Sequence, residues 1–586
     1  MTVYVDKVTV TNYRSIVSAE FLLGPYTPLV GYNNCGKSNA ISAIQWLLRR
    51  VTMSAADFHN TSAPLEVSGD ISGITQVEIE AMPQRQQLQI QPFIVNTCIK
   101  IKRSQSTPAA KASEITLSVW DPRTNSWTPN PVGLDNALGV LLPEPIRIGA
   151  MEDAAEDATK AKTSTTIGKL LAQFIAPVRA AHQTELINLL SEIERRLSCD
   201  GDTRFTELIT IESAISNKIN ELFPGIGARL HFPVPGIDDL IKSGTLKLYE
   251  GTGSAKDFSS YGHGTQRSVQ MALVRHLAEV RRNSLAPQGT TLLLIDEPEL
   301  YLHPFAIEQV RAALKSLATN GYQVIFSTHS AQLVSAGDAQ HALLMRKDQT
   351  HGTYARKRLR DAIQVVVPNA VHQMEQLFTL TNSSQVLFAD RVILTEGKTE
   401  LRLVPCLYQN VRSKTLGQEC TALVPQSGSN DTRKSMEILR AMDIPCKAVV
   451  DLDYALTGAI THEFIEASDP DVAILKGILQ RLAAASAITL NPNTGLPQNG
   501  VVRAHEAFAL LAAEPDAIAA IDRIHRNFLI QNIWLWKRGA IETHLGLSKK
   551  NESEWARFQT QLELHGLQDT CSDHASIAAM LSWAAT

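Results

Sequence analysis

The stretch GYNNCGKSNAISAIQWLLRRV, residues 31–51, decides the fold of the first part of the chain. Its first eight residues fit the pattern GxxxxGK[ST], with the apolar run PLV before them and a helical pattern after them. The glycines let backbone N–H groups turn inward around phosphate oxygens, and the following helix directs its positive end at the same charge. Lys37 is expected to reach the β- and γ-phosphates, and Ser38 to bind Mg²⁺. The stretch therefore predicts a strand, a phosphate-binding loop (P-loop) and a helix.

A second part of the same site is expected much later in the chain. The apolar run TLLLIDE, residues 291–297, reads as a buried strand that ends in two acids. Beside a P-loop, Asp296 is predicted to hold the Mg²⁺ shell, and Glu297 to activate the attacking water. The alternative is the N-terminal cap of a helix, which Pro298 would suit.

Further segments resemble the motifs of ABC-type ATPases, in the order of that family. SYGHGTQ (260–266) resembles the signature motif, and LYLHP (300–304) resembles the D-loop. His329, at the end of the strand YQVIFST, resembles the switch histidine that senses the γ-phosphate. In that family the signature motif caps a nucleotide that the partner holds. With one P-loop and one signature in the chain, the resemblance implies ATP as the ligand and a homodimer of ATPase heads.

The branch of this family that includes the chromosome-organising ATPases has an N-terminal arginine near the nucleotide. Arg14 in NYRSI matches that arginine, and a surface arginine accounts for it equally well. The resemblance thus implies a set of residues that bind ATP and its Mg²⁺: Arg14, Asn34, Gly36, Lys37, Ser38, Asn39, Gly262, Gly264, Gln266 and Asp296.

Acidic residues near the C-terminal end form a second constellation. RVILTEGKTE places Glu396 at the end of a strand and Glu400 four residues later, on the same side of a helix that would begin between them. AVVDLDYA ends another apolar strand with Asp451 and Asp453, whose spacing would direct both side chains to one face of the strand. Carboxylates at the ends of parallel strands converge at one crevice. Solvated acids are the alternative, but Mg²⁺ or Mn²⁺ would let all of them stay ionised.

The Glu-Gly and Asp-x-Asp elements resemble the Toprim domain. Behind an ABC-type head they resemble the OLD (overcoming lysogenization defect) family of nucleases, over essentially the whole chain. The resemblance implies that Glu542, in RGAIE, is a ligand of a second metal ion. It also implies a basic residue near the metals that stabilises the developing charge on phosphate. We assign Lys549 to this role, with Lys550, Lys537 and Arg538 as alternatives.

Strands and helices alternate along most of the chain, which predicts an α/β fold. Residues 65–150 hold strand-like runs, among them VEIEAM and LQIQPFIV. Residues 151–222 have apolar side chains at helical spacing, and this stripe packs on its own domain or forms a dimer interface. With the resemblance, we expect an ABC/SMC-like ATPase domain split by a helical dimerisation insert, followed by a Toprim domain with a Rossmann-like parallel sheet. The expected boundaries are 1–150 and 223–385 for the ATPase domain, 151–222 for the insert and 386–586 for Toprim.

The overall composition bears on how the protein could contact DNA and on where in the cell it works. The net charge of −4 over 586 residues gives no global attraction to nucleic acid, so DNA must be held by local basic patches or metal ions. Seven scattered cysteines without a CxxC pair argue against a zinc site and suit a reducing cytoplasm. No apolar run approaches the roughly 20 residues of a membrane helix. We therefore expect a cytoplasmic protein without membrane contact.

The leading hypothesis is an ATP-hydrolysing DNA endonuclease that cuts with two divalent metal ions, Mg²⁺ or Mn²⁺. The resemblance implies a role in phage defence or prophage-encoded exclusion and, as in some relatives, a helicase-like partner. One alternative is an SMC-like DNA-binding ATPase with a non-cutting Toprim domain. A topoisomerase would need a catalytic tyrosine in a separate domain, and no tyrosine follows Tyr454. The implied catalytic residues are Glu297, His329, Glu396, Asp451 and Lys549, and the implied metal ligands are Ser38, Asp296, Glu396, Glu400, Asp451, Asp453 and Glu542.

Overall fold

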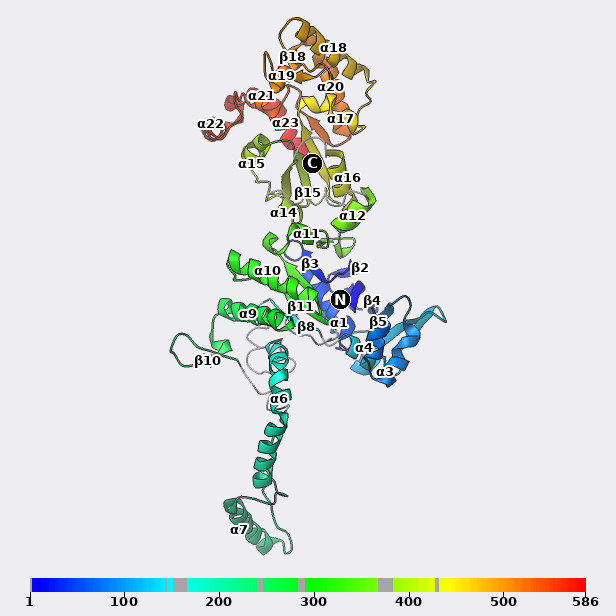
Figure 1. Ribbon diagram of the computed structural model, residues 1–586, viewed down its shortest axis with the longest axis vertical. Helices are drawn as coiled ribbons and strands as arrows, with labels where there is room; N and C mark the ends of the chain where they lie inside the picture. The colour runs from blue at the N-terminus through cyan, green and yellow to red at the C-terminus, as the bar shows by residue number, and fades with distance from the viewer. Residues whose placement is uncertain are drawn as a thin grey trace. The chain divides into compact units, whose positions relative to one another are not determined.

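The computed structural model confirms the α/β class (Figure 1). The chain divides into two compact units, Met1–Thr27 with Ser38–Leu333 and Pro28–Lys37 with Val334–Thr586. The residues that the structure describes are 3–142, 145–150, 166–237, 239, 246–282, 290–366, 383–426 and 432–586.

An antiparallel run of six strands forms one part of the first unit. The strands lie in the order β7-β6-β5-β4-β1-β2, and each pairs with its neighbour in antiparallel register. Buried and partly buried residues alternate along β4, as expected for a sheet with one face on a core. The bounds are Tyr4–Tyr13 for β1, Ile16–Leu22 for β2, Leu65–Ser72 for β4, Ile99–Gln105 for β5, Thr116–Asp121 for β6 and Ser126–Pro129 for β7.

Three parallel strands form the other part of this unit, in the order β12-β11-β8. Every residue of β11 (Thr291–Asp296) and β12 (Tyr322–Thr328) is buried, as is typical of parallel strands covered on both faces. Their side chains share a core with those of α9 (His263–Arg282) and α10 (Pro304–Thr319). The strand β8 (Ile146–Ile148) lies at the edge, beside β11.

Two segments predicted as strand-like are helices. VEIEAM lies largely in α2 (Gln76–Glu80), and the start of LQIQPFIV lies in α3 (Gln84–Ile90). The reason is local, because the Glu78 carboxylate accepts a hydrogen bond from the backbone N–H of Thr75 in a capping box, which starts a helix. The other elements of this unit are α1 (Lys37–Leu48), which begins two residues before the helical pattern that follows Ser38, α4 (Leu134–Leu141), β9 (Lys247–Leu248) and β10 (Lys256–Asp257).

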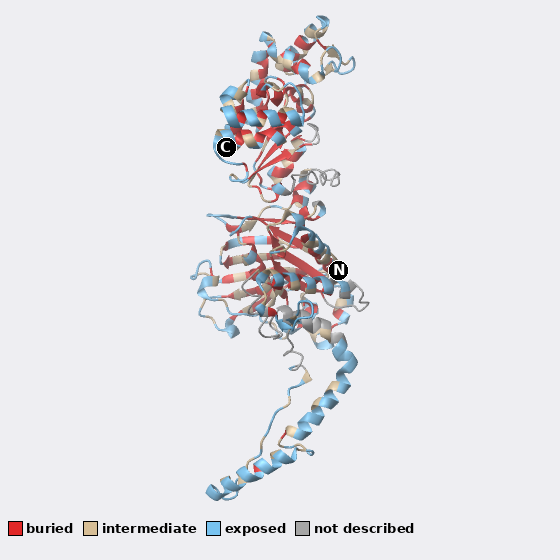
Figure 2. Ribbon diagram, turned by 90° about the vertical axis from the view of Figure 1, so that its left-hand side faces the viewer, coloured by how far each residue is buried: buried red, intermediate tan, exposed pale blue. Residues whose placement is uncertain are grey.

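The helices predicted for the insert are present as α6 (Thr166–Leu197) and α7 (Thr206–Leu222). Residues 151–165 of the predicted insert lie outside the described part of the chain. Figure 2 shows both helices coloured mostly as exposed. Several of their large apolar side chains are exposed, among them Leu189 and Ile193 on α6 and Ile209 on α7.

A four-stranded parallel sheet forms the centre of the second unit, in the order β16-β15-β17-β20. The chain runs from β15 (Arg391–Thr395) to β16 (Thr421–Pro425) on one side and then to β17 (Cys446–Val450) on the other side. The loops that follow β15 and β17 therefore diverge, and such a reversal opens a crevice at the carboxyl edge of a sheet. The fourth strand is β20 (Ile533–Leu535).

Each face of this sheet has its own core, because successive side chains of a strand point to opposite faces. Val392 and Leu394 belong to one cluster and Ile393 to the other, and β16 and β17 divide in the same way. The flanking helices are α15 (Lys398–Arg412), α16 (Thr432–Ala441), α21 (Ile541–Leu545), α22 (Glu552–Thr570) and α23 (His574–Ala585).

The remaining elements of the second unit lie before β15 and between β17 and β20. The first group holds strands in the order β14-β13-β3, in which β13 is antiparallel to β14 and parallel to β3. No helix among the described residues combines the length and the apolar character needed to cross a bilayer. The bounds are β3 Tyr26–Val30, α11 Ala336–Ala339, β13 Leu343–Asp348, β14 Gly352–Ala355, α12 Leu359–Val366, α14 Ser383–Val386, α17 Gly458–Thr461, α18 Pro470–Ala484, β18 Thr489–Leu490, β19 Pro497–Gln498, α19 Ala504–Ala513 and α20 Pro515–Ile530.

Candidate functional site

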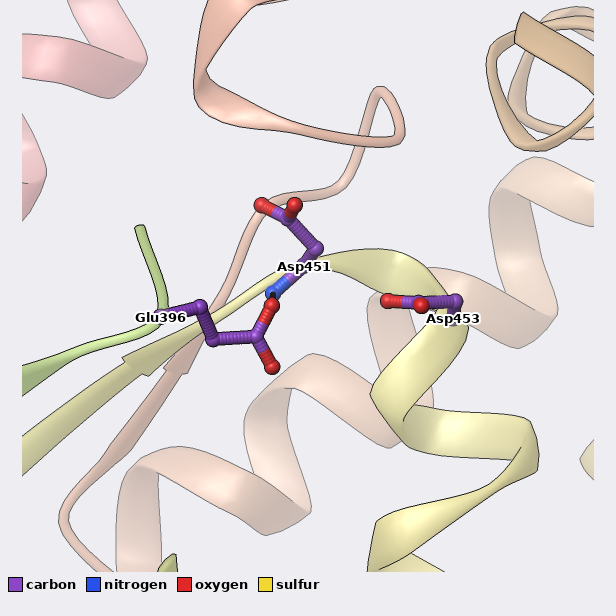
Figure 3. Close-up of side chains that lie close together, drawn as sticks. All are labelled: Glu396, Asp451 and Asp453. Carbon is purple, nitrogen blue, oxygen red and sulfur yellow. Dashed lines mark hydrogen bonds between the residues drawn. The ribbon is translucent and has the colours of Figure 1, made fainter. Parts of the chain in front are cut away.

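Three carboxylates meet at the carboxyl edge of the parallel sheet in the second unit. Glu396 follows the last residue of β15, and Asp451 follows the last residue of β17. Figure 3 shows these two at the ends of neighbouring strands and Asp453 on the helical turn that follows. One carboxylate oxygen from each of Glu396, Asp451 and Asp453 lies within 4.8 Å of the others. The structure thus brings together three of the predicted metal ligands.

The prediction that Asp451 and Asp453 both lie on a strand is wrong. The strand ends at Val450, and Asp451 is the N-cap of a 3-10 turn, Leu452–Leu456, that contains Asp453. The backbone N–H of Leu452 donates to the carbonyl of Gly539, 2.7 Å away, and not to a sheet neighbour. The chain therefore turns after Asp451, and the turn still brings both carboxylates to the same place.

Glu400 and Glu542 extend this cluster. Glu400 lies in the first turn of α15, after Gly397, and is 3% exposed. A Cβ atom at Gly397 would lie 3.0 Å from the Glu400 carboxylate, so a larger residue here would press on that carboxylate. Glu542 comes from α21 and is also buried. Burial and the charge of Glu542 raise the pKa of Glu400 to about 7, which follows from how close the two acids lie.

The electrostatics of the cluster disfavour ionisation of the acids on their own. Burial, followed by the charges of Asp453 and Glu400, raises the pKa of Glu396 to about 8. Burial and the neighbouring charges of Glu400 and Glu396 raise the pKa of Asp451 well above its usual range. Acids that disfavour ionisation this strongly are typical of functional sites.

The hydrogen bonding of the cluster supports the same conclusion as its pKa values. Glu396 Oε1, Asp451 Oδ1 and Asp453 Oδ1 are buried oxygens without a hydrogen-bond partner. Buried acceptors of this kind are rare unless an ion or water satisfies them. Carboxylate oxygens are the ligands that Mg²⁺ and Mn²⁺ prefer, so the residues present fit divalent cations.

Thr399 and Lys550 hold Glu542 from two sides. The Thr399 hydroxyl donates to Glu542 Oε1 at 2.6 Å, and both residues are buried. Lys550 Nζ lies 3.0 Å from Glu542 Oε2. Burial lowers the pKa of Lys550, but Glu542 and Asp451 outweigh this effect and raise it, so the ammonium stays charged.

The structure places Lys550, and not Lys549, beside the acids. Lys549 is exposed, whereas Lys550 pairs with Glu542. The two other candidates have different partners, since Lys537 pairs with Asp522 at 2.9 Å and Arg538 pairs with Asp573 at 3.2 Å. The pattern of the sequence did not separate the adjacent lysines, because the loop between Glu542 and Lys550 has no period that assigns a direction to either.

The P-loop belongs to the second unit up to Lys37. Lys37 Nζ donates to the carbonyls of Gly31 and Tyr32, at 3.0 and 3.1 Å. Asn34 and Gly36 have φ values of 65° and 94°, so the loop curls back on itself at these residues. A Cβ atom at Gly31 would lie 2.5 Å from the carbonyl oxygen of Met345, which explains glycine at this position.

Arg14 and Asn39 meet in the first unit. Arg14 Nη1 donates to Asn39 Oδ1 at 3.4 Å, and Asn39 donates to the hydroxyl of Ser15 at 2.7 Å. Arg14 also pairs with Asp57, at 2.8 Å. Arg14 therefore reaches the helix that follows the P-loop in the chain, two residues after Lys37.

The acids at the end of β11, Asp296 and Glu297, have polar partners on β8 and on or directly after β12. Asp296 accepts from Ser327 Oγ and from Arg147 Nη2, both at 3.1 Å. Glu297 has a φ of 48°, a left-handed conformation that is uncommon for a non-glycine residue. His329 Nε2 lies 3.4 Å from Glu297 Oε1. The structure thus brings the predicted switch histidine to the predicted general base.

The predicted signature residues Gly262, Gly264 and Gln266 lie at the start of α9. Gln266 Nε2 donates to the carbonyl of Tyr261 at 2.7 Å. The next residue, Arg267, donates to the carbonyls of Asp296 and Glu297 and so ties α9 to the acidic turn. Sequence reasoning missed Arg267, Arg147 and Thr399; of these, Thr399 and Arg267 directly adjoin residues of recognised motifs.

Known proteins resemble the chain in both regions. The family "Overcoming lysogenization defect protein-like, TOPRIM domain" matches residues 387–453, and "AAA domain, putative AbiEii toxin, Type IV TA system" matches residues 205–335. The Old nuclease of Escherichia phage P2 is 37% identical over 564 residues, which cover 95% of each chain. The OLD nuclease of Thermus scotoductus is 25% identical over 462 residues, 76% of this chain and 81% of that protein. A solved SMC head bound to the C-winged helix domain of ScpA aligns with 62% of this chain and 99% of its own, at 16% identity and a TM-score of 0.37.

Proposed function

The chain belongs to the OLD family of nucleases, which combine an ATPase domain with a Toprim domain, and on this premise we propose that it cuts DNA with two divalent metal ions. The observation that carries the proposal is a cluster of five buried or half-buried acids, in which Glu396, Asp451 and Asp453 have raised pKa values and buried oxygens without a hydrogen-bond partner. The oxygens of acids on the protein surface would be hydrated by water, whereas the oxygens of this cluster are buried. Bound divalent cations would satisfy these oxygens and offset the negative charge of the acids.

The five acids divide into two sets of ligands. Glu396, Asp451 and Asp453 would hold one ion, since their oxygens lie within 4.8 Å of one another. Glu400 and Glu542, together with Asp451, would hold the second, since the charge of Glu542 acts on Glu400 and the charge of Glu400 acts on Asp451. Two such ions supply an activated water and stabilise the leaving oxygen of a phosphodiester.

Two further residues of this site, Thr399 and Lys550, would position a metal ligand and stabilise charge on the phosphate. Thr399 fixes the Glu542 carboxylate through its hydroxyl, so that the second oxygen of Glu542 faces Lys550. The Lys550 ammonium, charged and half-exposed, is placed to stabilise the negative charge that builds on phosphate. This role replaces the one expected for Lys549.

The first half of the chain acts as an ABC-type ATPase in this proposal. Lys37, Ser38 and Asp296 would bind MgATP. Glu297 would accept the proton of the attacking water. His329, whose Nε2 lies 3.4 Å from Glu297 Oε1, would orient the Glu297 carboxylate. We propose the domain division expected above: an ATPase domain of residues 1–150 and 223–385, the insert 151–222 and the Toprim domain 386–586.

Two copies would form a homodimer, in which the signature residues of one copy cap the nucleotide of the other. The exposed apolar side chains of α6 and α7 support an interface on the insert. Leu189 and Ile193, 53% and 45% exposed, lie four residues apart and so on one side of α6. Exposed apolar side chains grouped along one helix are typical of interaction surfaces.

The biological role belongs to the same proposal. With an Old nuclease of a phage among its relatives, the chain would act in phage defence or in prophage-encoded exclusion, on DNA and with a helicase-like partner. All seven cysteines are free thiols, which supports a reducing compartment such as the cytoplasm.

A plasmid-nicking assay tests the nuclease proposal. Wild-type protein is incubated with supercoiled DNA and Mg²⁺ or Mn²⁺, with and without ATP, beside the Asp451→Ala variant. The Glu563→Ala variant, which removes an exposed acid from α22, is the control. We expect nicking by wild type and control and none by Asp451→Ala. Absence of nicking by wild type with either metal would reject the nuclease and favour an SMC-like DNA-binding ATPase.

A further inference from the structure

Arg147, on β8, joins this strand to β11 and to α1 beside the predicted Mg²⁺ ligand Asp296. Its side chain extends from β8, whose residue Arg147 lies opposite Leu294 in the parallel register with β11. Nη2 donates to Asp296 Oδ2 at 3.1 Å. Nη1 donates to Ser42 Oγ at 2.8 Å and to Gln45 Oε1 at 3.1 Å, both on α1. One guanidinium thus bonds an acid on a strand and two polar groups on a helix.

The contact with Ser42 continues to the start of the helix. The Ser42 hydroxyl accepts from Arg147 and donates to the backbone carbonyl of Ser38 at 2.8 Å. Asp296 and Ser38 are the two residues expected to contribute to the Mg²⁺ shell of the nucleotide. A continuous chain of polar contacts therefore runs from one expected Mg²⁺ ligand to the other, through Arg147 and Ser42.

The Asp296 carboxylate needs such a partner. Its side chain is 4% exposed, and a buried carboxylate without a counter-charge is strongly disfavoured. Ser327 bonds Oδ1 and Arg147 bonds Oδ2, so the plane of the carboxylate is fixed from both sides. Each oxygen has two lone pairs, which leaves each with one for a water of the Mg²⁺ shell.

From this geometry we infer that Arg147 is a positioning residue for Mg²⁺ in the ATPase site, an inference that rests on the ATPase half of the proposed function. The guanidinium holds Asp296 and the start of α1 at a constant separation, so that a metal ion meets both without rearrangement. A planar fork suits this role, because a lysine ammonium does not reach two opposed groups in one geometry. None of the recognised motifs includes this residue.

A competing role would have the opposite consequence. If the guanidinium occupied the place of the metal ion, it would have to leave before Mg²⁺ bound. Removing Arg147 would then lower the Mg²⁺ concentration that the protein requires. If Arg147 positions Asp296, its removal raises that concentration, so the direction of the change separates the two roles.

The test uses the full chain and a fluorescent ATP analogue. Binding of the analogue is measured over a range of Mg²⁺ concentrations and in EDTA, and ATP hydrolysis is measured in parallel. For Arg147→Ala we expect the half-saturating Mg²⁺ concentration to rise about ten-fold, as loss of one charge-assisted hydrogen bond implies, with binding in EDTA within about two-fold of wild type. The half-saturating Mg²⁺ concentration of Arg147→Lys should lie between those of wild type and Arg147→Ala.

Ser42→Ala provides a milder second variant that a helix tolerates well. It removes the link to Ser38 and keeps the ion pair with Asp296, and we expect a rise of about two- to three-fold in the Mg²⁺ requirement, as for one neutral hydrogen bond. An unchanged or lowered Mg²⁺ requirement in Arg147→Ala, or in Ser42→Ala should Arg147→Ala not fold, overturns the inference. If wild-type protein neither binds nor hydrolyses ATP, the proposed ATPase function itself fails, which is a separate result.

Discussion

The Thr399 hydroxyl donates a 2.6 Å hydrogen bond to the carboxylate of Glu542, although 143 positions separate the two residues in the chain. Both side chains are buried. The bond joins the first turn of α15 to α21, and so fixes the acid of α21 near the acids that follow β15 and β17. In the proposed two-metal site, the geometry of the second set of ligands depends on this bond.

Loss of this hydrogen bond should weaken metal binding and DNA nicking without removing any of the proposed metal ligands. For Thr399→Val, which keeps the shape and removes the hydroxyl, we expect nicking to fall by about 10- to 100-fold, the effect typical of losing a group that orients a metal ligand. Binding of Mn²⁺, followed by electron paramagnetic resonance, should weaken in parallel. Thr399→Ser is the matched control and should stay close to wild type. A valine variant with wild-type affinity for Mn²⁺ would disprove the role.

The adjacent lysines allow a direct comparison. Lys550→Ala should lower the rate of nicking by about 10²–10³-fold, since one preorganised charge at the reacting phosphate is removed. Lys549→Ala removes the same charge from the neighbouring exposed position and should change the rate little. The rates are measured on supercoiled plasmid at saturating Mn²⁺. Equal losses in both variants would show that the positive charge of the loop matters and not the contact of Lys550 with Glu542.

The raised pKa values predict how stability depends on pH in the absence of metal. The pKa of Glu396 is about 8 in the folded protein, against 4.5 for an ordinary glutamate. Between these values the folded chain binds more protons than the unfolded chain, so the free energy of unfolding falls as the pH rises. For protein treated with EDTA we expect the unfolding temperature to fall from about pH 5 to about pH 8, by several degrees.

Two controls accompany this measurement. Glu396→Gln carries no charge at either pH and should reduce the slope. Added Mn²⁺ should raise the unfolding temperature most at the higher pH, where the acids are ionised. An unfolding temperature that rises with pH in EDTA would contradict the prediction that the acids destabilise the metal-free fold.

Lys37→Ala tests the nucleotide half by itself. Its ammonium is the charge expected to meet the β- and γ-phosphates, and its loss should reduce ATP hydrolysis by about 10²–10³-fold. Binding of Mn²⁺ by the acids of the second unit should not change. Lys100→Ala, at a 54% exposed lysine on β5, is the control. Hydrolysis at the wild-type rate by Lys37→Ala would refute the P-loop assignment.

The insert is tested through the oligomeric state. Replacing Leu189 and Ile193 of α6 with glutamate places two charges among exposed apolar side chains. Burying them at an interface would cost several kcal/mol, so sedimentation velocity should show monomers in place of dimers. Ser191→Glu, on the same helix, should leave the dimer intact. A dimer that persists in the double variant would locate the interface elsewhere.

Much of the architecture was predictable because its signals are local. The P-loop needs consecutive glycine, lysine and serine residues, and Asp296, Glu396 and Asp451 stand at or directly after the ends of largely apolar strands. Short elements with mixed signals were less predictable. The runs VEIEAM and LQIQPFIV alternate like strands, but local capping and helix-forming residues make α2 and α3.

The sequence by itself determined which chemical groups are present and in which motifs, because a motif is defined by neighbours in the chain. Only the tertiary structure decided which of two adjacent lysines meets Glu542, and that Arg147 reaches Asp296 over 149 positions. It also decided that Asp453 joins the cluster from a turn and not from a strand. The physical reason is the same in each case: the direction of a side chain at a loop or a strand edge depends on packing against distant segments, which no local period records.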